Sequence, residues 1–147
     1  MSAMETIAGQ DVKSVNHVHV TWAGGQQFDA GRPGGATHRI DGDATSGPSP
    51  VDTLLNALAA CTAIDVVEIL AKRRTPVRTL QVQVDGARAA ATPSRVIGVL
   101  LTYRIAGDGI ERVHAERAIE LAVTKYCSVR DSLDPSLPVR WVLELES

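Results

Sequence analysis

The sequence predicts an α+β protein in which one long, buried helix is covered by antiparallel strands. The first observation is the segment 50–74, which holds no Gly or Pro after its first residue. Its apolar side chains lie around most of a helical wheel, as in a central helix. The second observation is that the segments on both sides alternate apolar and polar residues, which is typical of strands with one buried face. The predicted order of elements is β-β-β-α-β-β-α-α-β.

The composition is that of a globular protein. The 147 residues fit a single domain, 1–147, with a flexible arm at residues 1–14. The chain is 44% hydrophobic and 22% charged with a net charge of -2, and it lacks the basic excess of nucleic-acid-binding proteins. No uncharged apolar run of about 18 residues and no secretory signal are visible. We therefore expect a cytoplasmic protein with neither a nucleic-acid nor a membrane partner.

Three short strands are predicted before the long helix, at residues 16–22, 26–29 and 38–41. His17 and His19 share one face of the first strand, and this spacing can hold a metal ion. No third ligand with supporting spacing is visible, so exposed strand histidines without a metal are the favoured interpretation.

The start and the end of the long helix are both marked. Ser49 is the predicted N-cap, Pro50 suits the first turn, and Asp52 completes an S-x-x-D capping box. The basic residues 72–74 suit the negative end of the helix dipole, and Pro76 prevents continuation.

The C-terminal half predicts a second layer of strands and helices. Its elements are strands at 80–85, 95–105 and 139–145, a helix at 111–126, and a short helix that begins at Ser128. An apolar helix in so short a chain needs cover on more than one side, which favours a homodimer.

The two cysteines lie in different helical segments. Cys61 is in the middle of the long helix, with Asp65 one turn later, and Cys127 is at the seam before the short helix. A helix N-terminus, Lys125 and Arg130 lie near Cys127, and these features predict a lowered thiol pKa there.

Three interpretations of the cysteines stay open on residue patterns alone. Composition favours two inert core thiols, because free cysteines usually behave as small buried hydrophobes. A static disulfide is less favoured in an intracellular compartment. The third interpretation is a redox pair, in which one thiolate attacks a peroxide and the other resolves the sulfenic acid as a disulfide.

Two segments carry a resemblance to a known family. Residues 47–65 (GPSPVDTLLNALAACTAID) and 125–129 (KYCSV) resemble the two cysteine segments of the OsmC/Ohr family, the osmotically inducible and organic hydroperoxide resistance proteins. The order of elements and the length agree over nearly the whole chain.

The resemblance implies a thiol peroxidase of oxidative-stress defence, on an intertwined homodimer with antiparallel sheets wrapped around central helices. It implies that Cys61 is the peroxidatic and Cys127 the resolving cysteine, at a site on the dimer interface. The implied substrates are organic hydroperoxides, and the implied reductant is a small dithiol or a lipoylated protein. No cofactor and no metal are implied.

One position departs from the family pattern. Val51 stands where established peroxidases of the family have a Glu that helps to organise an Arg near the thiol, which places the chain closer to the OsmC-like branch. Arg32 and Arg39 are both candidates for that Arg. For Asp52, the role of a helix cap is favoured over that of a catalytic acid.

Asp65 and Glu68 are expected either to shape the pocket or to pair with an Arg or a backbone group. The alternative to the enzyme is a non-catalytic dimer of the same fold that binds a hydrophobic small molecule or senses redox state.

Overall fold

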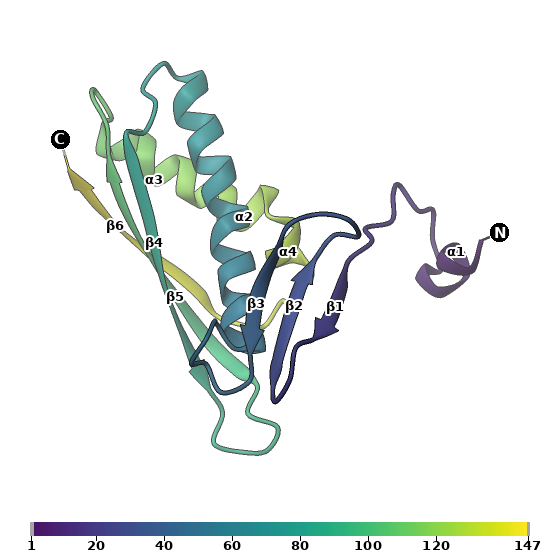
Figure 1. Ribbon diagram of the computed structural model, residues 1–147. Coiled ribbons are helices and arrows are strands. Elements are labelled where there is room, and N and C mark those ends of the chain that lie inside the picture. The colour runs from purple at the N-terminus through teal and green to yellow at the C-terminus, as the bar shows by residue number, and fades with distance from the viewer. Residues whose placement is uncertain (1, 147) are drawn as a thin grey trace. The chain divides into compact units, whose positions relative to one another are not determined.

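The structure is a computed structural model that describes residues 2–146 (Figure 1). The chain divides into two compact units, of which the first ends at Val51 and the second begins at Asp52. Each unit has its own three-stranded sheet.

The first unit is an antiparallel sheet preceded by a short helix. The sheet has the order β1-β2-β3 and consists of β1 (His19–Trp22), β2 (Gln27–Gly31) and β3 (Thr37–Asp41), which confirms the three predicted strands. β1 is exposed over its whole length, so the apolar side chains of Val20 and Trp22 are 59% and 66% exposed.

The helix of the first unit was not predicted. Helix α1 (Ala3–Ala8) lies within the segment that the sequence analysis assigned to a flexible arm. Its N-terminus is closed by a capping box between Ser2 and Glu5, and its C-terminus by Gly9 in the left-handed conformation. Local hydrogen bonds alone therefore account for this helix.

A buried carboxylate organises the loop that leads out of β3. Asp41 is 1% exposed and accepts hydrogen bonds from the backbone N–H groups of Asp43 and Ser46 and from the hydroxyls of Thr45 and Ser46. The backbone hydrogen bonds hold the pKa of Asp41 well below its usual range. This fixed loop leads to the start of the long helix.

The second unit packs helices against one face of a sheet with the order β4-β5-β6 (Figure 1). Its elements are α2 (Pro50–Lys72, whose first two residues belong to the first unit), β4 (Thr79–Arg88), β5 (Val96–Ala106), α3 (Arg112–Leu121), a π-helical turn η1 (Ala122–Tyr126), α4 (Ser128–Asp131) and β6 (Val139–Glu146). Alternate residues of β5 fill the core, and Leu101, Tyr103 and Ile105 are all nearly fully buried.

Two elements differ from the sequence prediction. β6 pairs with β5 in parallel, whereas antiparallel sheets were expected. The parallel direction arises because the chain returns to the same end of the sheet through α3, η1 and α4. The predicted helix 111–126 is interrupted, and its last five residues form the π-helical turn.

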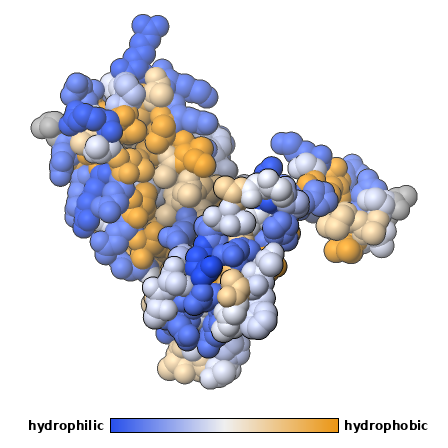
Figure 2. Space-filling view, in the orientation of Figure 1, coloured by the Kyte–Doolittle hydropathy of each residue, from blue (hydrophilic) through white to orange (hydrophobic). Residues whose placement is uncertain are grey.

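Helix α2 has one buried and one exposed apolar side. Leu58, Val66 and Leu70 are 0% exposed, whereas Leu54 and Ile64 are 41% and 59% exposed. Hydrophobic side chains accordingly gather on the surface of the second unit (Figure 2). By length and composition α2 would suffice to cross a membrane, and core helices of soluble proteins meet the same criteria.

Candidate active site

Cys61 lies in the middle of α2 and is half-buried. It packs against the hydrophobic core of the second unit. The next residue, Thr62, is 0% exposed and points its hydroxyl at the sheet. The helix thus holds Cys61 at the margin of the core, with part of its surface open.

Cys127 lies where the π-helical turn ends, and it is 4% exposed. Its Sγ accepts a hydrogen bond from the backbone N–H of Arg130 at 3.2 Å, so Cys127 itself caps α4. The S-x-x-D pattern of residues 128–131 predicts the cap one residue later, at Ser128. Because the π turn and the new helix meet at Cys127, its backbone position is fixed from both sides.

The structure brings the two cysteines together. The side chain of Cys61 lies near enough to the Cys127 thiol to raise its pKa. Both thiols are free, so they are neighbours and not a disulfide.

The expectation of a lowered pKa at Cys127 is wrong. Burial raises the pKa of Cys127 to about 11, and the neighbouring Cys61 adds to this, although the Arg130 N–H group acts the other way. The nearby cations do not compensate. The Arg130 guanidinium donates to the carbonyls of Asp134 and Leu137, and Lys125 Nζ lies over the Tyr126 ring, 5.5 Å from its centroid.

Two buried hydroxyl groups near the two thiols, those of Thr62 and Tyr103, were not predicted from the sequence. Thr62 Oγ1 donates to the Ala59 carbonyl at 2.9 Å and lies 2.5 Å from Tyr103 Oη. Burial raises the pKa of Tyr103 to about 12, the Thr62 hydroxyl opposes this, and the charge of the Cys127 thiolate adds to it. The only signal for Tyr103 was its place on the alternating, buried face of a predicted strand.

The two candidate arginines both lie in the first unit, and they differ in how they are held. Arg39 Nε donates to Asp29 Oδ1 at 3.0 Å, and its Nη1 donates to Gln27 Oε1. Arg32 is exposed in the turn between β2 and β3 and forms no ion pair within residues 2–146. Support of Cys61 by either arginine stays a prediction.

Asp65 and Glu68 are the carboxylates of the C-terminal half of α2. Asp65 is half-buried and forms no ion pair in the described part of the chain, and neither does the exposed Glu68. Desolvation raises the pKa of Asp65, and the charge of Glu68 adds to the effect. The expected pairing of these two carboxylates with an Arg is therefore not observed.

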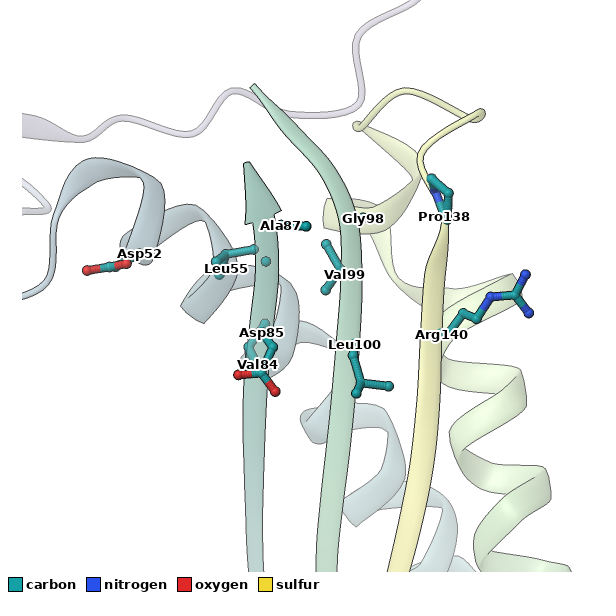
Figure 3. A pocket seen from close by; sticks show the side chains of 11 residues that line it. Asp52, Leu55, Val84, Asp85, Ala87, Gly98, Val99, Leu100, Pro138 and Arg140 are labelled. Atoms are coloured by element: carbon teal, nitrogen blue, oxygen red, sulfur yellow. The ribbon is translucent and has the colours of Figure 1, made fainter. Parts of the chain in front are cut away.

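A cavity of about 690 Å³ opens at the N-terminal end of α2 (Figure 3). Asp52 lies on one side of it and Arg140 on the other, and between them lie the carboxylate of Asp85 and the apolar side chains of Leu55, Val84 and Leu100. Neither cysteine lines this cavity. In residues 2–146, no group of three His, Cys, Asp or Glu side chains is arranged to hold a metal ion.

The chain is similar to known proteins over most of its length. The family model described as OsmC-like protein matches residues 41–142. Protein YhfA of Escherichia coli (strain K12) is 32% identical over 123 residues, which are 82% of this chain and 90% of YhfA.

Two solved structures share the fold. The OsmC like protein from Mycoplasma pneumoniae superposes with a TM-score of 0.77 at 15% identity, over 92% of this chain and 100% of that one. The organic hydroperoxide resistance protein OhrB of Bacillus subtilis gives a TM-score of 0.58 at 16% identity, over 90% of this chain and 100% of that one. The resemblance seen in the two cysteine segments is confirmed: the chain belongs to the OsmC-like protein family.

Proposed function

We propose that this chain is a thiol-dependent peroxidase that reduces organic hydroperoxides through Cys61 and Cys127. The observation that carries the proposal is the proximity of these two thiols, which belong to separate elements far apart in the chain. A solved structure of the same fold is named an organic hydroperoxide resistance protein, which supports the choice of substrate.

The reaction needs only the two cysteines, a peroxide and a reductant. The Cys61 thiolate attacks the distal oxygen of the hydroperoxide, the O–O bond breaks, and the alkoxide leaves as an alcohol after taking up a proton. Cys61 is then a sulfenic acid. The Cys127 sulfur attacks the Cys61 sulfur, a disulfide forms, and the sulfenic hydroxyl leaves as water with the thiol proton. A dithiol, free or as a lipoylated protein, returns both cysteines to thiols and is itself oxidised.

The surroundings of the two thiols favour this division of roles. Cys61 is the more exposed of the two, so a peroxide reaches it first. Cys127 is buried, and its raised pKa keeps it protonated at neutral pH, which makes it a poor first nucleophile. Its proximity to Cys61 suits it to attack once the sulfenic acid has formed.

A cation beside the reacting thiol would stabilise the thiolate and the leaving oxygen. We assign this role to Arg39 rather than Arg32, because Asp29 and Gln27 hold its guanidinium in one orientation. Asp29 thus helps to organise Arg39, which is the role of the Glu that established peroxidases of the family have at the position of Val51. Asp52 and Asp65 have supporting roles near the ends of this site.

The proposal includes a homodimer in the cytoplasm. The exposed apolar side chains of α2 and of β1 need cover, and a second copy of the chain supplies it. This arrangement matches the dimer that the family resemblance implies.

The test is the consumption of cumene hydroperoxide with a dithiol by the wild type, Cys61→Ser and Cys127→Ser. We expect Cys61→Ser to fall to the background rate. Cys127→Ser should keep a single turnover and lose most of its steady-state rate, unless the external dithiol reduces the sulfenic acid directly. Equal background rates in all three proteins would refute the peroxidase.

A second candidate function is the binding of a hydrophobic small molecule, with the thiols as bystanders or redox sensors. The observation that favours it is the cavity of about 690 Å³, which combines apolar side chains with three charged ones, those of Asp52, Asp85 and Arg140 (Figure 3). Val51 in place of the family Glu favours it as well. Saturable binding of a hydrophobic fluorescent probe that Leu55→Glu abolishes, together with background peroxidase rates, would establish this alternative.

A further inference from the structure

A second cavity lies between the C-terminal end of α2 and helix α3, and it has a volume of about 280 Å³. Its lining consists of four basic and three apolar residues: Ile69, Lys72, Arg73, His114, Arg117, Ala118 and Leu121. Because the helical rise is about 1.5 Å per residue, Ile69 lies about 12 Å along α2 from Cys61. The cavity is therefore separate from the thiol pair, and a ligand bound in it would be independent of the peroxidase.

The basic residues of this cavity are not neutralised by the rest of the chain. Within residues 2–146, Lys72, Arg73 and Arg117 form neither an ion pair nor a side-chain hydrogen bond. His114 is the exception, because its Nε2 lies 3.1 Å from Glu111 Oε2. Three permanent positive charges thus gather around one cavity without an acidic partner.

The helix dipole accounts for only two of these charges. Lys72 and Arg73 lie at the C-terminal end of α2, where positive charge interacts favourably with the carbonyl groups. Arg117 comes from the middle of α3, where this argument does not apply. Its position beside the two α2 cations therefore needs another explanation, and an anion bound among them supplies one.

The floor of the cavity is apolar. Ala118 is 0% exposed, and Ile69 and Leu121 are half-buried beside it. Apolar walls combined with a few charged groups at one edge are typical of sites for small organic ligands. Arg side chains pair well with carboxylate and phosphate groups, because two N–H donors of the guanidinium match two oxygens.

We propose that this cavity binds a small amphipathic anion, with a carboxylate or phosphate head group on a short apolar chain. Arg73 and Arg117 hold the head group, Lys72 adds a third positive charge, and Ile69 and Leu121 contact the chain. The volume of about 280 Å³ limits the ligand to a small molecule, since ligand cavities usually range from about 300 to 1,000 Å³.

The test is isothermal titration calorimetry of the full chain at low ionic strength with four probes: hexanoate, hexyl phosphate, inorganic phosphate and hexanol. We expect saturable binding of hexanoate or hexyl phosphate, and the tighter of the two identifies the head group. Inorganic phosphate and hexanol should bind more weakly, because each lacks one half of the ligand. Binding of hexanol as tight as that of both anions would overturn the proposal.

Variants locate the binding at this cavity. The double variant Arg73→Gln/Arg117→Gln should weaken binding of the better probe by about tenfold or more, since it removes two charge-assisted contacts. The matched control is Arg104→Gln, which removes an exposed arginine on β5 that lines neither of the two cavities, and it should leave the affinity unchanged. Equal affinities of the double variant and the control would refute the site.

A readout on the wild type covers the case in which the double variant does not fold. In methyl NMR spectra, hexanoate or hexyl phosphate should shift the signals of Ile69, Ala118 and Leu121. Unchanged signals at saturating probe would mean that the long basic side chains merely cover the apolar floor with their own stems, and the proposal would fail.

Discussion

The hydroxyl groups of Thr62 and Tyr103 form a buried pair beside the thiols, between α2 and β5. Thr62 Oγ1 donates its proton to the Ala59 carbonyl, so the phenol of Tyr103 must be the donor in the contact between the two hydroxyls. The raised pKa of Tyr103, about 12, keeps that proton in place at neutral pH. The pair therefore ties the helix that carries Cys61 to the central strand of the sheet.

We expect Tyr103→Phe to lower the free energy of unfolding by about 1–2 kcal/mol, because it removes one buried hydrogen bond and leaves the ring in place. Urea denaturation measures the change. Tyr126→Phe is the matched control, since Tyr126 is 51% exposed and its ring contact with Lys125 survives, and it should stay within about 0.5 kcal/mol. Equal effects of the two changes would contradict the role of the buried pair.

The buried thiol of Cys127 predicts a loss of stability in alkali. Its pKa is raised from 9.0 to about 11 in the folded chain, so above pH 9 the unfolded state loses the proton first. The stabilisation that comes from keeping this thiol protonated is complete below the pKa of the unfolded state, and it is lost as the pH rises towards the pKa of the folded state. A shift of this size corresponds to about 3 kcal/mol.

Urea denaturation from about pH 8 to about pH 11 tests this prediction. The wild type should lose stability more steeply than Cys127→Ala, which lacks the group. Alkaline groups away from Cys127 titrate in both proteins and cancel in the comparison, and the effect of the Cys127 charge on Tyr103 is part of the measured difference. Parallel curves for the two proteins would show that Cys127 does not carry the effect.

At the scale of elements, α2 lies close to β4 because of one glycine. A Cβ placed on Gly86 would lie 2.8 Å from Leu55 Cδ1, so any side chain there pushes the helix or Leu55 away. Gly98 on the neighbouring strand β5 has no such neighbour, since a Cβ there meets nothing within 4 Å. The two glycines lie in adjacent strands, but of the two only Gly86 lacks the space for a side chain.

We therefore expect Gly86→Val to destabilise the chain by about 1–3 kcal/mol through overpacking. Gly98→Val should be neutral or slightly stabilising, because a β-branched residue suits an exposed strand position. Thermal and urea denaturation of the two variants measure the difference. Equal destabilisation would mean that strand conformation, and not the contact with Leu55, decides the effect.

Periodicity predicted most elements, because it reports which face of an element is buried. It found all six strands of residues 2–146, while the capping residues placed the start of α2 at Pro50, as observed. It could not predict the direction of β6, since a parallel and an antiparallel strand share one alternation. The π-helical turn before Cys127 was missed for a similar reason, because a one-residue change of hydrogen-bond register leaves the apolar pattern intact.

The candidate site was less predictable than the elements. Both cysteines were identified from their segments, but their proximity and the burial of Cys127 depend on how distant segments pack. Charges near Cys127 in the sequence suggested a lowered pKa, and desolvation proved the larger effect. Local sequence shows which charges are near a group along the chain, but it does not show how much water the fold removes from that group.

At the scale of the whole molecule, the chain leaves apolar surface on both of its units. Trp22 of β1 is 66% exposed, and on α2 an apolar stripe at helical spacing leaves Leu54, Ile64 and Val67 exposed by 41%, 59% and 39%. Apolar patches of this kind are typical of protein interfaces. A second copy of the chain, packed with its own α2 against this stripe, would complete the burial that the sequence pattern of the helix predicts.

We therefore expect the wild type to be a dimer at micromolar concentration and Ile64→Lys to dissociate it, as measured by analytical ultracentrifugation. A charge forced into an apolar contact costs about 3 kcal/mol, which corresponds to a dissociation constant raised about a hundredfold. Val113→Lys is the matched control, because Val113 on α3 is 64% exposed but lies outside the stripe. Circular dichroism should show both variants folded. A monomeric wild type, or equal dissociation of both variants, would show that α2 is not the contact between copies, and the exposed stripe would then need a different partner.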